Sequence, residues 1–328
     1  MSRTLPRLLL LLVVLLALVV AAVLAGSAGL TPAAVLRTLA GGGTETERII
    51  VLELRMPRVA LAVLAGGGLA LSGAVFQALL RNPLAEPYIL GVSGGAAVGA
   101  VAALVLGSAA LAPWTMPVAA LAGAVGAVAL VFRVALRAGR ALDTRVLLLA
   151  GVVVGAFFNA VILLLLTLTG TESFRDALKW MMGSLAAASW GSTLMLAAYV
   201  LPASALLIAL ARPFNLLAIG EETALYLGTR VERVKVTAYV VASLVVAATV
   251  AQCGPIGFVG LVVPHAVRLL WGSDHRLLLP ASFLGGGIFL LLADTAARTL
   301  ASPNELPVGI VTALVGVPLF VTLLRRSA

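Results

Sequence analysis

Charged residues are scarce in this chain. They make up only 11% of its 328 residues, whereas a soluble domain carries about 25%. So few charges cannot cover the surface of a water-soluble protein of this length. Together with a hydrophobic content of 62% and a mean hydropathy of +1.16, this scarcity predicts an integral membrane protein.

Cysteine, histidine and lysine are also rare. One cysteine, Cys253, excludes an intramolecular disulfide framework and a cysteine-based metal cluster. The two histidines, His265 and His275, lack the spacing or carboxylate context of a zinc site. Neither lysine, Lys179 nor Lys235, stands in the G-x-x-x-x-G-K-[S/T] pattern of a phosphate-binding loop. We therefore expect no metal site, no catalytic residues and no nucleotide site in this chain.

Long apolar runs repeat along the whole chain. About 20 residues cross the hydrocarbon core of a bilayer as a helix, so these runs predict a single all-α, polytopic membrane domain over residues 1–328 with about ten spans. The expected spans are 8–28, 59–80, 88–108, 117–137, 146–168, 192–211, 236–253, 255–271, 277–297 and 306–324. Merging the seventh and eighth across Gly254-Pro255 would give nine. We expect the first span to remain uncleaved.

The basic residues fall unevenly between the two sides of these spans. With the N-terminus inside, 15 of the 22 lie on the inner side, and lysine and arginine are enriched in cytoplasmic loops. The net charge of +9 is explained in this way without a nucleic-acid partner. We expect both termini in the cytoplasm, which leaves Arg55, Arg58 and Arg298 on the outer side.

Glycine is frequent inside the apolar runs, most densely at 66–68 and 285–287. Small residues let helix backbones approach closely in lipid, so these clusters predict tight helix packing. Ion-coupled carriers place ionisable residues near the middle of the bilayer, but here the acidic residues lie almost wholly in loops or at span ends. Asp294 comes nearest to an exception, and its spacing of four from Arg298 predicts a pair on one helix face.

The longest inner connection covers residues 213–235. Its apolar pairs, Leu216/Leu217 and Ala224/Leu225, predict short amphipathic helices broken at Gly220 and Gly228. Exposed apolar residues on a cytoplasmic loop indicate a protein partner. An ion-coupled secondary transporter, which would need charges at mid-membrane and no such partner, is the rival interpretation.

Eight motifs in order resemble the FecCD-type permeases, the membrane subunits of binding-protein-dependent ABC importers for vitamin B12, haem and ferric siderophores. They are R-M-P-R at 55–58, R-N-P-L-A-E-P-Y-I-L-G-V-S-G-G at 81–95, L-L-L-A-G-V at 147–152, W-M-M-G at 180–183, G-E-E-T-A-L-Y-L-G at 220–228, G-P-I-G-F-V-G-L-V-V-P-H-A-V-R at 254–268, L-L-A-D-T-A-A-R at 291–298 and E-L-P-V-G at 305–309. The resemblance covers almost the whole chain.

The resemblance implies a type II ABC importer permease in the cytoplasmic (inner) membrane of a bacterium or archaeon. Its expected partners are a second copy of itself, two ATP-binding cassette subunits, a periplasmic or lipid-anchored substrate-binding protein and membrane lipid. The chain itself would hold no cofactor, because ATP and Mg²⁺ bind to the partner ATPase. The expected cargo is an iron chelate, a ferric siderophore or haem, with cobalamin as the alternative.

The resemblance also assigns roles to particular residues. Arg55, Arg58 and Arg298 match the arginines that dock the binding protein, with lipid-headgroup anchoring as the alternative role. The residues expected to contact the ATPase through the coupling loop at 213–235 are Glu221, Glu222, Leu227 and Gly228. The residues that match the cytoplasmic gate are Asn82, Leu84, Asp143 and Thr144.

Overall fold

The computed structural model describes residues 4–26, 29–107, 114–138, 144–302 and 304–327, and within these ranges the chain is helical with no strand. The elements are α1 (Thr4–Leu24), α2 (Pro32–Leu39), α3 (Glu45–Arg48), η1 (Ile49–Arg55), α4 (Met56–Leu79), η2 (Pro87–Leu90), α5 (Val92–Val105), α6 (Thr115–Ala138), α7 (Thr144–Thr167), α8 (Thr171–Met181), α9 (Trp190–Ala209), α10 (Ala211–Ile219), α11 (Glu221–Tyr226), α12 (Val231–Cys253), α13 (Val259–Trp271), α14 (His275–Thr299) and α15 (Val308–Ser327).

The expected all-α, polytopic membrane fold is confirmed. Among the described residues, seven helices are long and apolar enough to cross a bilayer, and three shorter apolar helices cover Val92–Val105, Val259–Trp271 and Val308–Leu323. These helices overlap the ten predicted spans, and α12 and α13 are separate helices. The chain is broken between α12 and α13, where Gly254 and Phe258 both have a positive φ of 68°.

The helix that contains the second predicted span starts well before that span. Helical structure begins at Glu45 and runs without interruption to Leu79. A capping box starts it, because the backbone N–H of Thr44 donates to Glu47 Oε2 at 2.8 Å and that of Glu47 donates to Thr44 Oγ1 at 3.3 Å. The segment Ile49–Arg55 is wound as a π-helix, a form that is rare and frequent at functional sites.

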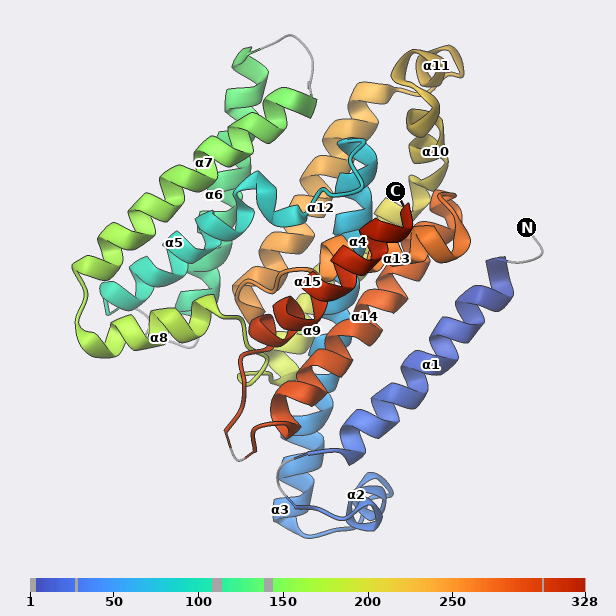
Figure 1. Cartoon of the computed structure of the whole chain (residues 1–328). Coiled ribbons are helices and arrows are strands. Elements are labelled where there is room, and N and C mark those ends of the chain that lie inside the picture. The colour runs from blue at the N-terminus through green and yellow to red at the C-terminus, as the bar shows by residue number, and fades with distance from the viewer. Residues whose placement is uncertain (1–3, 27–28, 108–113, 139–143, 303, 328) are drawn as a thin grey trace.

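Helix α4 occupies the centre of the molecule (Figure 1). It packs against α14, α12, α13 and α9, and almost every residue from Val59 to Leu79 is buried. Glycines allow the close approach. A Cβ on Gly66 would overlap the backbone of Gly286 on α14, and one on Gly73 would overlap Gly260 on α13. The predicted tight packing at the two glycine clusters is therefore confirmed.

A second group of helices lies to one side of α4. Helices α5, α6 and α7 pack on one another, and α8 crosses their lower ends in Figure 1. Gly95 on α5 and Gly123 on α6 face each other so closely that a Cβ on either would overlap the other's carbonyl group. Helix α12 contacts both α4 and α6, so it joins this group to the rest of the bundle.

Side chains from the loop between α4 and α5 hold the break between α12 and α13. The hydroxyl of Tyr88 donates to Ile256 O and accepts from Ile256 N, both at 2.9 Å. Glu86 Oε1 accepts from the backbone N–H of Phe258 at 2.8 Å, and burial raises the pKa of the Glu86 carboxyl. These bonds satisfy backbone groups that the break leaves without helical partners.

The glycine contacts predict that two glycine-to-alanine substitutions will differ in their effect on the free energy of unfolding. Gly73→Ala should lower the free energy of unfolding by about 1–3 kcal/mol, because the new methyl group overlaps the Gly260 backbone. Gly126→Ala on α6 meets nothing within 4 Å and should be neutral or stabilising by up to about 1 kcal/mol. Thermal unfolding in detergent measures both. Equal melting temperatures for the two variants would contradict the packing described for α4.

Candidate functional site

A cluster of charges is buried at the end of the bundle where α2 and α3 lie. Its centre is Asp294 on α14, which has no exposed surface. Nε of Arg58 on α4 donates to Asp294 Oδ1 at 3.0 Å, and Nη2 of Arg58 lies 2.9 Å from the same oxygen. Arg298, one turn further along α14, places its Nε 3.1 Å from Asp294 Oδ2. The predicted pair of Asp294 with Arg298 is confirmed, and Asp294 also joins α14 to α4.

The second carboxylate in this cluster is Glu305, in the connection between α14 and α15. Nη1 of Arg58 donates to both of its oxygens, at 2.8 and 3.1 Å. Glu305 is the more accessible of the two acids, since 38% of its side chain is exposed. Arg58 thus lies between the fully buried carboxylate of Asp294 and the partly exposed carboxylate of Glu305.

Arg55 and Arg298 also bind the end of α1. Nη1 of Arg55 donates to Val23 O at 2.9 Å and to Leu24 O at 3.3 Å. Arg298 donates to Ala22 O and Ala25 O, both at 3.4 Å. These carbonyls belong to the last turn of α1 and the residue after it, where backbone acceptors lack helical partners. The arginines therefore fix the position of α1.

The three arginines and Glu305 line a hollow of about 320 Å³, together with Gly26, Ile50, Leu54, Ala186 and Ala188. Nη2 of Arg55 has no hydrogen-bond partner among the described residues. Three guanidinium groups face two carboxylates here, so the cluster keeps one positive charge in excess. A hollow of this kind suits a carboxylate, which binds guanidinium groups through charge-assisted hydrogen bonds.

The opposite end of the bundle carries an apolar surface on α10 and α11. Tyr226 is 92% exposed, and Leu225, Leu227 and Ile219 are exposed beside it. The helices break at Gly220 and Gly228, both with a positive φ, as the sequence predicted. Figure 1 shows α11 as the outermost element at this end. Large apolar side chains at the tip of a loop indicate a surface for another protein.

The predicted coupling residues differ in their surroundings. Glu222, Leu227 and Gly228 are exposed. Glu221 instead pairs with Lys235 at 3.0 Å and with Arg81 at 3.4 Å, so it holds α11 against α12 and against the loop after α4. Its role in the structure is therefore to position α11.

Asn215 on α10 ties this surface to α14. Its amide nitrogen Nδ2 donates to Asp274 Oδ1 at 2.7 Å, and its oxygen accepts from the backbone N–H of His275 at 2.9 Å. The backbone N–H of Arg276 and the amide of Asn215 hold the pKa of Asp274 below its usual value. Helix α10 is thereby joined to the start of α14.

The predicted gate residues lie in the loop after α4 where the structure describes them. Oδ1 of Asn82 accepts from the backbone N–H of Leu84 at 2.9 Å, which shapes the turn, and Leu84 is exposed. The preceding residue, Arg81, has a positive φ of 47° and reaches Glu221 of α11. This loop is therefore in contact with the α10–α11 surface. Asp143 and the side chain of Thr144 lie outside the described part of the chain.

The model of the FecCD transport family matches residues 11–326 of this chain. The chain belongs to the FecCD transport family.

The names of similar proteins are consistent with that assignment. The chain is 48% identical over 284 residues to the cobalamin import system permease protein BtuC of Halobacterium salinarum, covering 87% of this chain and 75% of the relative. It is 41% identical over 287 residues to the hemin transport system permease protein HmuU of Yersinia pestis, covering 85% and 84%. It is 42% identical over 280 residues to the uncharacterized ABC transporter permease protein YvrB of Bacillus subtilis, covering 85% and 79%.

A solved structure shares the fold. An ABC transporter described as of metal-chelate type, in an inward-facing conformation, superposes with a TM-score of 0.88 at 32% identity, covering 97% of this chain and 98% of that one. This FecCD permease is therefore a membrane subunit of an ABC importer.

Sequence reasoning missed two features of these sites. It did not place Glu305 beside Arg58, although the E-L-P-V-G motif was noted, because 247 residues separate the two along the chain. It also omitted Tyr226 from the coupling surface. An aromatic residue between Leu225 and Leu227 in a cytoplasmic loop was the available signal.

Removal of the central carboxylate should be costly in this FecCD permease. Asp294→Asn leaves Arg58 and Arg298 buried with one charge fewer between them, which should lower the free energy of unfolding by about 3–5 kcal/mol. Arg37→Gln, which breaks the exposed Arg37–Glu47 pair at 3.1 Å, should change it little. Thermal unfolding in detergent compares the two variants. A loss for Asp294→Asn no larger than the control's would show that the cluster does not support the fold.

Proposed function

We propose that this chain imports a metal chelate as the permease subunit of an ATP-driven complex. The observation that carries the proposal is the presence of two unlike surfaces at opposite ends of one bundle. One is a cationic hollow around Arg55, Arg58 and Arg298, and the other is the apolar tip formed by α10 and α11. An importer needs one surface for the protein that delivers the cargo and one for the protein that supplies energy.

The apolar tip is the proposed contact with an ATP-binding cassette subunit. Tyr226, Leu225 and Leu227 would enter a groove on that subunit, with Glu222 and Gly228 at the edge. Aromatic anchors dominate the binding energy of protein interfaces. Family membership favours ATP-driven import over an ion-coupled carrier, and ATP with Mg²⁺ would bind to the partner, since this sequence has no phosphate-binding loop.

The cationic hollow is the proposed dock for a substrate-binding protein. The unpaired Nη2 of Arg55 and the excess positive charge support this role. A carboxylate on the binding protein would insert between Arg55 and Arg58, and charge complementarity would speed its approach and set its register. The burial of all three arginines supports recognition by an inserted side chain, and it disfavours the alternative role in anchoring lipid headgroups.

The proposed orientation puts the α10–α11 end in the cytoplasm and the hollow outside. The excess of arginine and lysine in the loops at the α10–α11 end supports it. Both termini would then lie in the cytoplasm of a bacterial or archaeal cell, with the chain in its inner membrane.

A second copy of the chain would complete the path that the cargo takes across the membrane. Helix α7 exposes an apolar face that includes Leu149, Val153, Phe157 and Leu164, and two such faces across a dimer would enclose a route with apolar walls. ATP binding would move α11. The Arg81–Glu221 contact would carry that movement to the loop that holds Asn82 and Leu84, and so open one end of the path as the other closes.

For the cargo we propose a corrinoid such as cobalamin first, and haem or a ferric siderophore second. This reverses the order expected from the breadth of the family, because the relative named for cobalamin is 48% identical and the one named for hemin is 41% identical. The visible spectrum of the purified cognate binding protein tests it, since the three chromophores absorb differently. A corrinoid spectrum would support the first choice. A colourless protein that binds none of them would refute this cargo class.

Docking should depend on Arg55 in particular. Arg55→Gln should weaken binding of the substrate-binding protein about tenfold or more, which corresponds to at least about 1.4 kcal/mol. Arg48→Gln removes the same charge from an exposed residue at the same end of the bundle and should leave the affinity within about twofold. Surface plasmon resonance on the intact complex measures both. Equal affinities for the two variants would remove the hollow as the dock.

Coupling should depend on the apolar tip. Tyr226→Ser combined with Leu227→Ser should reduce ATPase-subunit binding about thirtyfold or more, because truncation of interface anchors costs at least about 2 kcal/mol. Leu36→Ser removes an exposed leucine on α2, at the other end of the bundle, and should have no effect. Co-purification of the two subunits measures binding. Full retention of the ATPase by the double variant would disprove the coupling role.

A further inference from the structure

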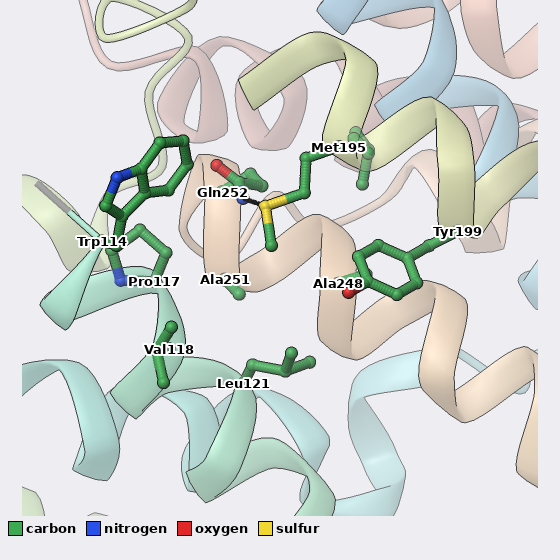
Figure 2. Close-up of a pocket in the computed structure, with 10 residues that line it drawn as sticks. Trp114, Pro117, Val118, Leu121, Met195, Tyr199, Ala248, Ala251 and Gln252 are labelled. Atoms are coloured by element: carbon green, nitrogen blue, oxygen red, sulfur yellow. Dashed lines mark hydrogen bonds between the residues drawn. The ribbon is translucent and has the colours of Figure 1, made fainter. Parts of the chain in front are cut away.

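An apolar groove runs along the surface between α6, α9 and α12. Figure 2 shows Val118 and Leu121 of α6 facing Tyr199 of α9, with Ala248 of α12 between them. Val118 and Tyr199 are exposed, at 55% and 48%. The groove is therefore open along the side of the bundle, where the membrane would contact it.

A cavity of about 580 Å³ with a different lining adjoins the groove. Trp114, Pro117, Ala251 and Gln252 border both spaces. The cavity adds polar groups from the start of α9 and from α8, among them Ser189, Ser192, Asp176 and Trp180. An apolar space and a more polar one thus lie side by side.

The change from apolar to polar follows the same direction on each of the three helices. The polar or amphipathic residue lies nearer the cavity in every case: Trp114 just before α6, Ser192 on α9 and Gln252 on α12. The cavity lies at the end of the bundle that carries the arginine hollow, because Trp190 beside it donates from its indole nitrogen to Leu52 O of η1 at 2.8 Å. Tryptophan is typical of the level of lipid headgroups.

The cavity contains groups that a polar ligand could bind. Among the described residues that line it, Asp176 is the one with a charge. Its ion-pair partner is Lys179 at 3.9 Å, and both side chains are largely exposed, so the carboxylate can bind a second cation. The amide nitrogen of Gln252 donates to the thioether of Met195 at 3.6 Å, and a thioether is a weak acceptor. Both groups can therefore turn to a ligand.

We propose that this site binds one phospholipid of the adjacent leaflet, with an acyl chain in the groove and an amine-bearing headgroup in the cavity. The occupant is phosphatidylethanolamine. Its ammonium group meets Asp176, its phosphate oxygens accept hydrogen bonds from the Gln252 amide and the hydroxyls of Ser189 or Ser192, and its chain lies on Val118 and Leu121. A lipid with an anionic headgroup meets the carboxylate of Asp176 and binds less tightly.

The experiment uses the permease–ATPase complex, stripped of lipid in mild detergent and titrated with phosphatidylethanolamine or phosphatidylglycerol in native mass spectrometry. The unchanged complex should bind one phosphatidylethanolamine per permease chain, at least fivefold more tightly than phosphatidylglycerol. Asp176→Asn should reduce the ratio of the two lipid affinities to about one, while the acyl chain still binds in the groove. Val118→Trp should fill the groove and reduce binding of both lipids at least fivefold.

Val134→Trp is the matched control, since Val134 is an exposed valine on the same helix that does not line the groove. It should bind lipid as the unchanged complex does. Equal binding by Val118→Trp and Val134→Trp, or an unchanged lipid ratio in Asp176→Asn, would overturn the proposal. So would a preference of the unchanged complex for phosphatidylglycerol. None of these three results would affect the proposed import function, which the docking and coupling variants test separately.

Discussion

The close approach of α4 and α14 is the constraint on which the rest of the structure depends. These helices touch at Gly66 and Gly286, where neither backbone leaves room for a Cβ. In lipid there is no hydrophobic driving force between helices, so such contact relies on small residues. The contact also sets the register of the two helices. Arg58 lies eight residues before Gly66, and Asp294 lies eight residues after Gly286, about 12 Å along each helix. Their charged groups meet at 2.9 Å.

This register brings the few buried charges of this membrane protein into contact with partners of opposite sign. A buried charge is tolerated only with a partner of opposite sign and good geometry. Asp294 has two such partners, and Glu305 adds a third carboxylate–guanidinium contact that is partly open to solvent. The same arginines hold the end of α1 through its carbonyl groups. A single cluster therefore stabilises the packing of three helices and leaves Arg55 with an unused donor at the surface hollow.

The two ends of the bundle are joined by polar contacts that follow α4. At one end lies the arginine cluster. At the other, Arg81 follows α4 and pairs with Glu221, which holds α11. Between these two ends, Tyr88 and Glu86 form hydrogen bonds with the backbone at the break before α13. The Tyr88 and Glu86 contacts satisfy backbone groups of Ile256 and Phe258 at the break, so they are expected to stay formed when the helices move as rigid units.

The sequence by itself determined the membrane class, the approximate spans, the glycine contacts, the breaks at Gly220 and Gly228 and the family. The first four follow from local properties: hydropathy, the length needed to cross a bilayer, and glycine's lack of a side chain. The family follows from the resemblance of eight motifs in order. Only the tertiary structure decided that Arg58 lies between Asp294 and Glu305, that Glu221 pairs with Arg81 and Lys235 while Tyr226 is exposed, and that α6, α9 and α12 form a groove. Each of these depends on helix register and rotation between segments far apart in the chain, which apolar patterning leaves open when most faces of a helix are apolar.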